Sequence, residues 1–417
     1  MKTIQILTSL ALACALALPV SAQLTEEELD RYAAVTDYTP SSSGQSSLSG
    51  SAWAVQIRSR LGDMLQSELL RYSQLGLMVY DLTDQTVVFR HNERQRMRPA
   101  STMKLVSAIT ALDVLGGNYQ FRTSLFRKGE VSDGVLRGNL FCMGSMDPTF
   151  SADDLEEFAN AVTREGITRI EGSVVADKSM MGGDRWGEGW CWDDDNPTLS
   201  ALLVERKDNF AERLVQLLRQ KGITVTAGVD SGHTPQGVTI VAEHLTPIGT
   251  VLMRMMKNSD NLYAEAVFYQ VAAGEGKPAT AKKGAAAVKR LISRLGLSAD
   301  MYAVADGSGL SLYNYVSPEL MIRLLRHAYD TRRIFDHLYP VLPIAGVDGT
   351  LKNRMQGTRA EGNVHAKTGT VTSVSALAGY CTAANGHKIC FSIVNQGILK
   401  ASDGREFQNK VCELLCK

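Results

Sequence analysis

The pattern of hydrophobic and polar positions changes several times along the chain, and each change marks a different kind of element. Ile4–Val20 is an uncharged apolar run. Gln56–Tyr72 has helical periodicity, whereas Leu75–Leu82 and Gln85–His91 have the short patterns typical of strands, with a turn at Thr83-Asp84. The sequence therefore predicts that the folded part begins near Ala52, with a helix followed by a strand pair.

A helix predicted for about Ala100–Leu115 is apolar on nearly all sides, and such a helix belongs inside a domain. Pro99 precedes it, and Ser101 and Lys104 lie in its first turn. Because these two residues are three positions apart, their side chains share one face. The start of a helix also offers backbone N–H groups and positive potential to an anion.

From about Thr123 the chain alternates shorter elements. The predicted strands are Val135–Met143, Ile170–Ala176 and Ile223–Val229, and the predicted helices are Ala152–Arg164 and Asn209–Lys221. We interpret residues 124–236 as one inserted α/β domain. Residues 52–123 and 237–417 then form a single larger domain on either side of the insertion.

The part after the insertion is first helical and then forms strands. The predicted helices are Ile248–Met256, Asn261–Ala273 and Thr280–Leu295, and Ser317 with Pro318 begins another. The predicted β-hairpin consists of His365–Ala383 and His387–Gln396, and the closing helix is Asp403–Cys416. The apolar stripe of that last helix is better suited to docking on the core than to lying on a membrane. The expected fold class is therefore α+β.

Composition and charge narrow the class of protein. The 417 residues include 44 basic and 44 acidic side chains, so the chain lacks the excess of positive charge that is typical of nucleic-acid-binding proteins. Met1–Ala22 has the charged start, apolar run and small-residue end of a secretory signal, and residues 23–51 are an N-terminal segment and Ser-rich linker. We expect an exported, periplasmic or cell-envelope protein with no integral membrane segment after cleavage. A membrane helix, or a lipoprotein anchored through Cys14, fits the run less well.

Cysteine, histidine and acidic residues give no metal pattern, and we predict neither a metal nor another cofactor. The row Asp193-Asp194-Asp195 is typical of a solvated loop. The Asn385-Gly386 pair predicts a two-residue hairpin turn, which would place Cys381 opposite Cys390. In an oxidising compartment this pair forms either a disulfide or two small buried thiols.

Three short motifs carry the chemistry of the chain. They are Ser101-Thr102-Met103-Lys104, Ser259-Asp260-Asn261 and Lys367-Thr368-Gly369, and each occurs once. S-x-x-K, S-D-N and K-T-G in this order are the known signature of serine β-lactamases and penicillin-binding proteins. Each motif alone is weak, so the prediction depends on all three in order.

The residue types of the motifs suit acyl transfer. Ser101 needs a base, and Lys104 can act as one only when it is neutral. Burial lowers the pKa of Lys104, and we expect a second cation, Lys367, to lower it further. Ser259 is placed to pass the proton to the leaving amine, and Asn261 to hold the backbone amide of the substrate. The substrate has a free C-terminus, because a cation on a strand beside hydroxyl groups binds a carboxylate.

The carboxylate-binding residues on that strand are Lys367, Thr368 and Thr370. Gly369 lets the substrate backbone lie close to the strand. The N–H groups of Ser101 and Thr370 are the predicted oxyanion hole.

These motifs make the chain resemble the serine D-alanyl-D-alanine carboxypeptidase/endopeptidases, the low-molecular-mass class C penicillin-binding proteins. Further stretches that are similar to the family are Gly144–Thr149, Gly189–Asp194, Ser259–Glu265, Asp306–Ser311 and Leu342–Leu351. The resemblance runs from about Gln56 to Gln396. It implies a β-lactamase/transpeptidase-like domain, in which an antiparallel sheet is flanked by helices and accompanied by a helical subdomain. An insertion between the first two motifs interrupts this domain. It also implies hydrolysis of D-Ala-D-Ala, or of D-Ala–diamino-acid crosslinks, in peptidoglycan stem peptides, and covalent binding of β-lactam antibiotics.

The chain departs from the family pattern in two places. Only 158 residues separate Ser101 from Ser259, so we expect one inserted domain where relatives carry two. Met146-Asp147 replaces a glycine-aspartate pair, which changes a loop.

Two other functions share part of the signature. A serine β-lactamase needs a deacylating Glu in E-x-x-x-N after S-D-N, but Glu156–Asn160 matches only upstream, in the insertion. A non-catalytic penicillin-binding or wall-sensing protein would not require the Ser101/Lys104 pair.

Overall fold

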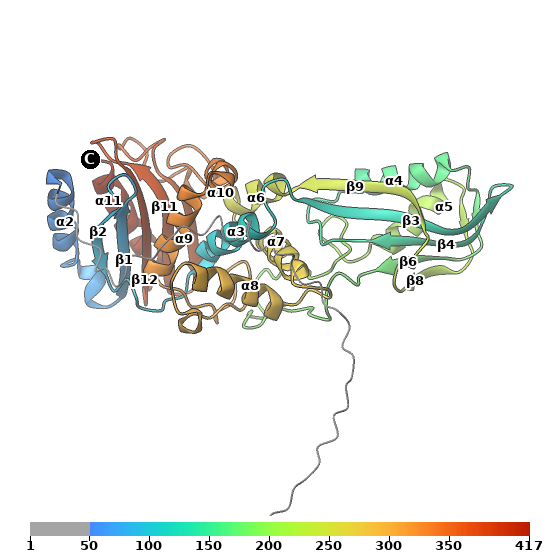
Figure 1. The fold of residues 1–417 in the computed structure, drawn as a ribbon, viewed down its shortest axis with the longest axis horizontal. Helices are drawn as coiled ribbons and strands as arrows, with labels where there is room; N and C mark the ends of the chain where they lie inside the picture. Colours follow the sequence, from blue (N-terminus) through green and yellow to red (C-terminus); the bar gives the residue numbers. More distant parts are fainter. Residues whose placement is uncertain (1–50) are drawn as a thin grey trace, which may run out of the picture. The chain divides into compact units, whose positions relative to one another are not determined.

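The structure is a computed structural model that describes residues 51–417 (Figure 1). The predicted signal segment, residues 1–22, and all but the last residue of the segment 23–51 lie outside the described residues. Within residues 51–417, no helix combines the length and the hydrophobicity that crossing a bilayer requires.

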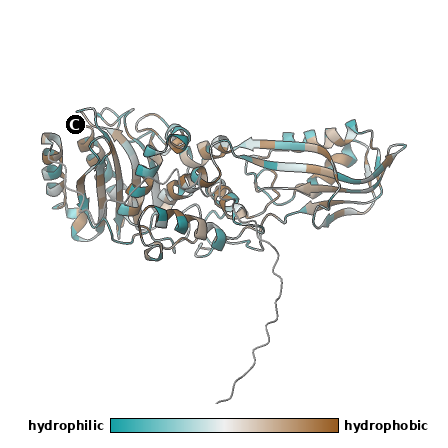
Figure 2. Ribbon diagram, viewed as in Figure 1, coloured by the Kyte–Doolittle hydropathy of each residue, from teal (hydrophilic) through white to brown (hydrophobic). Residues whose placement is uncertain are grey.

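A five-stranded antiparallel sheet joins the beginning of the described chain to its end, in the order β10-β11-β12-β1-β2. Its strands are β1 (Gln74–Asp81), β2 (Thr86–His91), β10 (His365–Val371), β11 (Val374–Thr382) and β12 (Lys388–Gln396). In Figure 2 the middle strands of this sheet show much brown, the colour of hydrophobic residues. Because β1, β11 and β12 are buried on both faces, they read as nearly continuous apolar runs.

Alternate side chains of β1 enter two different cores. Leu77 and Val79 pack with α2 (Ala52–Met64) and α11 (Ala401–Leu415) on one face. Met78 and Tyr80 face the other core, which includes α9 (Pro318–Asp330). This period of two is that of a strand with both faces covered. The closing helix therefore docks on the core, as predicted.

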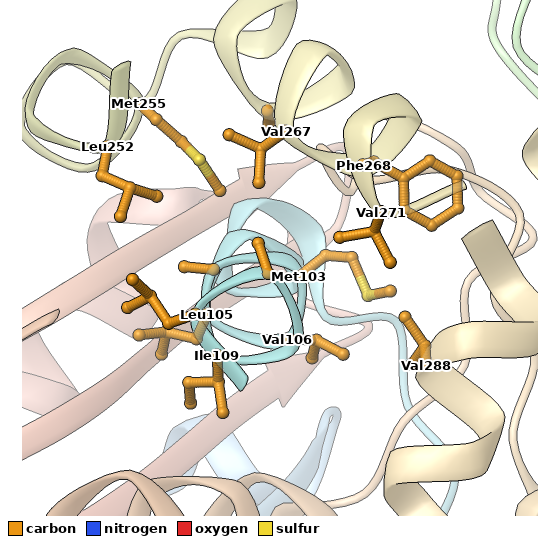
Figure 3. Packing of buried hydrophobic residues seen from close by; sticks show 14 of the residues in the cluster. Met103, Leu105, Val106, Ile109, Leu252, Met255, Val267, Phe268, Val271 and Val288 are labelled. Atoms are coloured by element: carbon orange, nitrogen blue, oxygen red, sulfur yellow. The ribbon is translucent and has the colours of Figure 1, made fainter. Parts of the chain in front are cut away.

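The helix that follows Ser101, α3 (Met103–Val114), lies inside a layer of helices. Its neighbours include α6 (Ile248–Lys257), α7 (Asn261–Gly274) and α8 (Ala281–Arg294), and Figure 3 shows apolar side chains surrounding α3. The first ten residues of α3 are all buried. The prediction of a helix enclosed on all sides is confirmed.

Short elements complete this part of the chain. They are η1 (Glu68–Arg71), η2 (Ala100–Thr102), η3 (Ala299–Met301), α10 (Arg332–Leu338), η4 (Tyr339–Val341) and η5 (Gly349–Leu351).

A second, seven-stranded sheet extends from Gln120 to Pro247. It contains β3 (Gln120–Ser132), β4 (Val135–Met143), β5 (Arg169–Ile170), β6 (Ser173–Asp177), β7 (Thr224–Val225), β8 (Gly228–Ser231) and β9 (Thr239–Pro247). With α4 (Ala152–Arg164) and α5 (Phe210–Gln220) it encloses an apolar core of its own. Strand β3 begins a few residues before the predicted insertion, 124–236, and β9 lies entirely after it, although both strands belong to this sheet.

Several predicted strands were too long. The prediction for Ile170–Ala176 covers two strands, β5 and β6, and that for Ile223–Val229 covers β7 and part of β8. The predicted hairpin arm His365–Ala383 is likewise two strands, β10 and β11. The chain reverses at Ser373, whose φ of +61° allows a tight turn.

The predicted pairing of Cys381 with Cys390 is wrong. Ala383 N donates to His387 O, which leaves three residues in the loop, and Gly386 takes a φ of +86°. The extra residue shifts the register, so Cys381 lies opposite Ile389, and Cys390 opposite Tyr380. Both cysteines are buried free thiols, and they belong to different cores.

This turn gives a stability prediction. Gly386→Ala places a Cβ in open space at a positive φ, so it should destabilise the protein by about 1 kcal/mol through backbone strain alone. Gly62→Ala, in α2 with equally open surroundings, is the matched control and should stabilise it by about 0.5–1 kcal/mol. Urea unfolding of both variants tests the opposite signs, and equal effects would contradict the turn geometry.

Candidate active site

Ser101 sits on a tight turn directly before α3. The predicted helix from Ala100 begins as the short η2 and becomes α-helical only at Met103. Ala100 has a φ of +47°, an uncommon conformation for a residue with a Cβ. The turn still places the two predicted partners together, with Lys104 Nζ 3.0 Å from Ser101 Oγ.

Lys104 is completely buried, and three oxygen atoms surround its amine. Besides Ser101 Oγ, these are Asn261 Oδ1 and the carbonyl oxygen of Ser308, each at 2.8 Å. Burial lowers the pKa of Lys104 to about 8, although the negative charges of Asp306 and Glu265 oppose this. A lysine with this pKa is neutral in about one molecule in ten at pH 7, which a general base requires.

The S-D-N segment connects α6 to α7. Ser259 takes a φ of +59°, and Asp260 caps α7 by accepting a hydrogen bond from Leu262 N. Asn261 is the first residue of the helix and reaches Lys104. Ser259 Oγ instead accepts a hydrogen bond of 2.9 Å from Lys367 Nζ. The two outer residues of this motif therefore bind the two lysines of the other motifs.

Lys367 is the second buried amine of the site. Its Nζ also donates to Thr368 O at 2.7 Å. Burial lowers the pKa of Lys367 well below its usual value, and the neighbouring Lys104 lowers it further. The sequence predicted a lowered pKa for Lys104 from burial and from Lys367. In the structure, burial lowers the pKa of Lys104, whereas the repulsion between the two cations lowers the pKa of Lys367.

Strand β10 passes very close to the turn that bears Ser101. A Cβ on Gly369 would lie 2.7 Å from Pro99 O and 3.1 Å from Ser101 N, so only glycine fits there. Thr370 is exposed beside it, and Thr368 Oγ1 donates to Thr350 Oγ1 at 2.8 Å. The structure thus brings all three motifs to one place, while the oxyanion hole at Ser101 and Thr370 stays a prediction.

Two buried carboxyl groups beneath Lys104 received no role from the sequence. Glu265 accepts hydrogen bonds from Gly307 N and Ser308 N, and Asp306 accepts them from Gly309 N. Further donors to Asp306 are Ser311 N, Asn314 Nδ2 and Trp190 Nε1. Burial, followed by the charge of Asp306, raises the pKa of Glu265 to about 8. These bonds fix the loop whose Ser308 carbonyl holds Lys104.

One signal for Glu265 was present in the sequence. It lies four residues after Asn261 on a helix that is otherwise apolar almost all round, and a buried acid there requires partners.

Within residues 51–417, the side chains with ligand atoms close enough together for a metal ion are Asp81, Asp84 and His387. His387 Nδ1 lies 2.8 Å from Asp81 Oδ2, and this contact raises the pKa of His387. Asp81 also accepts N–H bonds from Thr83 and Asp84. The group therefore joins two hairpin turns, a structural role that needs no ion.

Comparison with known proteins assigns the family. The model of the D-Ala-D-Ala carboxypeptidase 3 (S13) family matches residues 57–206 and 196–417. This chain belongs to the S13 family. The D-alanyl-D-alanine carboxypeptidase DacB of Haemophilus influenzae is 28% identical over 413 residues, which cover 78% of this chain and 86% of that protein. The D-alanyl-D-alanine carboxypeptidase of Actinomadura sp. strain R39 is 27% identical, with 82% and 81% covered.

Solved structures of an S13 relative agree with the fold. Penicillin-binding protein 4 (dacB) of Haemophilus influenzae is 26% identical and superposes with a TM-score of 0.78, covering 86% of this chain and 99% of that one. A second structure of that protein, complexed with a novel β-lactam, gives a TM-score of 0.73 at 27% identity, with the same coverage. The predicted fold class and family resemblance are confirmed.

The close approach of β10 to Ser101 can be tested by measuring stability, without an activity assay. Gly369→Ala forces a Cβ against backbone atoms, so it should destabilise the S13 enzyme by about 1–3 kcal/mol. Gly249→Ala, in α6 with nothing nearby, is the matched control and should not destabilise it. Thermal and urea unfolding measure both variants, and a Gly369→Ala protein as stable as wild type would contradict the contact.

Proposed function

We propose that this S13 enzyme hydrolyses the D-Ala-D-Ala bond of peptidoglycan stem peptides through an acyl-enzyme on Ser101. The observation that carries the proposal is the contact of 3.0 Å between Ser101 Oγ and a buried Lys104 whose pKa is lowered to about 8. A neutral amine at hydrogen-bonding distance is what a serine hydroxyl needs to become a nucleophile.

The proposed reaction has two steps. Lys104 Nζ takes the proton of Ser101 as Oγ attacks the carbonyl carbon of the penultimate D-Ala. Ser259, which bonds to Lys367, relays a proton to the amine of the terminal D-Ala, and the C–N bond breaks. Water then attacks the ester on Ser101 with Lys104 again as base, which releases the shortened peptide and restores the hydroxyl.

Substrate binding uses the remaining residues of the motifs. The terminal carboxylate lies against Lys367 and the hydroxyls of Thr368 and Thr370, and Asn261 holds a substrate amide. The N–H groups of Ser101 and Thr370 bind the oxyanion. Support comes from the fit of Gly369 against Ser101 N, since a strand this close leaves its backbone beside the reacting carbonyl.

The same arrangement accepts related substrates. A D-Ala–diamino-acid crosslink presents the same acyl group, so endopeptidase cleavage follows from the same step. A β-lactam acylates Ser101, in line with the β-lactam complex of the Haemophilus influenzae protein. We further propose that residues 124–236 act as an inserted domain, and that Met1–Ala22 directs export to the cell envelope.

A β-lactamase reading requires a deacylating glutamate near Ser101. The upstream match, Glu156–Asn160, lies in α4, where Glu156 is exposed and pairs with Lys221 at 3.2 Å. Because α4 packs on the second sheet, Glu156 is not available to deacylate Ser101. We therefore expect the penicilloyl ester on Ser101 to persist.

The first functional prediction concerns Ser101. Ser101→Ala should abolish labelling by a fluorescent penicillin and the release of D-Ala from purified muropeptides, because no other nucleophile replaces the hydroxyl. Gel fluorescence and mass spectrometry measure the two reactions, and thermal unfolding of Ser101→Ala beside wild type is the control for stability. Wild-type enzyme that leaves muropeptides intact, or a label that is lost within seconds, would contradict the carboxypeptidase assignment.

The second prediction concerns pH. Because Lys104 must be neutral to act as base, the rate constant of acylation should rise with pH, nearly tenfold from pH 6 to 7, and level off above about 8. Stopped-flow measurement with a fluorescent penicillin between pH 5.5 and 9.5, with unfolding followed over the same range, tests this. A profile that is flat across this range would contradict the role of Lys104.

A further inference from the structure

A strained turn in the chain between β6 and α5 carries an arginine to the active site. Val204 and Lys207 exchange two backbone hydrogen bonds of 3.0 Å each, so Glu205 and Arg206 are the central residues of a two-residue turn. Their φ values are +46° and +68°. This geometry favours Asn-Gly and is unfavourable for residues with long side chains. Backbone strain of this kind persists where the surrounding structure requires it.

The turn points Arg206 at the middle residue of the S-D-N motif. Its two terminal nitrogens donate to the two carboxylate oxygens of Asp260, at 2.6 and 3.2 Å. Arg254 adds a single bond of 3.0 Å from within α6. Burial raises the pKa of Asp260, but the bonds from Arg206 and Arg254 outweigh it and hold that pKa below its usual value. A paired arginine fork fixes the orientation of a carboxylate as well as its charge.

The position of Asp260 determines where two reactive side chains lie. Ser259 bonds to Lys367 and Asn261 bonds to Lys104, and both flank Asp260 directly. Ser259 is itself in a left-handed conformation. The segment between Lys257 and Asn261 has no regular structure. Besides the two arginines, the N–H of Leu262 bonds to the Asp260 side chain, so these contacts help to fix the conformation of the segment.

The segment that carries Arg206 is anchored on both sides. Ala201 and Leu203 pack in the core around α3, whereas Leu202 and Val204 pack in the core of the second sheet. Ala201 O also accepts a hydrogen bond of 2.6 Å from Met146 N. Because alternate side chains of this segment are buried in two different cores, the turn that follows has a fixed position, and so does Arg206.

We propose that Arg206 is a positioning residue, which holds Ser259 and Asn261 in register with the two lysines through Asp260. The inference rests on the proposed function of those residues. It gives the predicted insertion a part in catalysis, because the S-D-N segment would be incompletely supported without this turn.

The test uses glycine, which removes the guanidinium and relieves the strain at once. Arg206→Gly should keep a thermal midpoint within a few degrees of wild type, since glycine tolerates a φ of +68°. The second-order rate constant of acylation by a fluorescent penicillin should nevertheless fall by about 10–100-fold, because small misplacements of reacting groups are costly. Arg206→Lys, which keeps the charge but not the fork, should recover only part of the rate.

The matched control is Glu205→Gly, which relieves the neighbouring strained position and leaves Arg206 in place. It should acylate within about twofold of wild type. In an Asp260→Asn background, Arg206→Gly should cost less than about threefold, because its effect passes through that carboxylate.

Three outcomes would overturn the inference. They are wild-type acylation by Arg206→Gly, an equal loss in Glu205→Gly, and an undiminished loss in the Asp260→Asn background. Ser259→Ala separates these from a failure of the proposed function: if that variant acylates at the wild-type rate, the assigned roles of the S-D-N motif are wrong, whatever Arg206 does.

Discussion

The burial of two lysine amines in one site is the constraint on which the rest of the structure depends. An ammonium group removed from water is unfavourable, so Lys104 and Lys367 must each be held by oxygen atoms and each shift toward the neutral form. Hydroxyl, amide and carbonyl oxygens contact the two amines. The carboxyl groups of Asp306 and Glu265 affect the pKa of Lys104 through their charge, without a hydrogen bond to its amine. Paired carboxylates in direct contact would keep Lys104 charged and would deprive Ser101 of its base.

This constraint explains features that lie outside the motifs. Helix α3 is enclosed by apolar side chains because its first turn must exclude water from Lys104. Asp306 and Glu265 accept many backbone N–H bonds, which makes the loop at Ser308 rigid enough to offer one carbonyl to the amine. The hydrogen bonds of Lys104, Asp306 and Glu265 thus offset the unfavourable burial of these polar groups.

The sequence was most informative where one local rule decided the outcome. Helix Ala152–Arg164 and strand Val135–Met143 were predicted with their observed bounds. The motif residues also meet as predicted. Register was not predictable in the same way, because the loop before β12 holds one residue more than the Asn-Gly rule suggests. The partners of Arg206 and Glu265 depend on tertiary packing, although the place of Glu265 on an apolar helix was visible in the sequence.

Some of the positions where local rules fail lie around the reaction centre. Ala100, Ser259 and Arg206 all take positive φ values without being glycine, and each lies in or next to a reactive motif or contacts one. A Cβ on Gly309 would lie 1.9 Å from Ala100 O, so the loop and the nucleophile turn also touch at their backbones. A chain that avoided these conformations would be easier to fold, but Ser101 with Lys104, Ser259 and Lys367 come from three separate segments. Strain at these positions allows four polar groups to converge beside an apolar layer of helices.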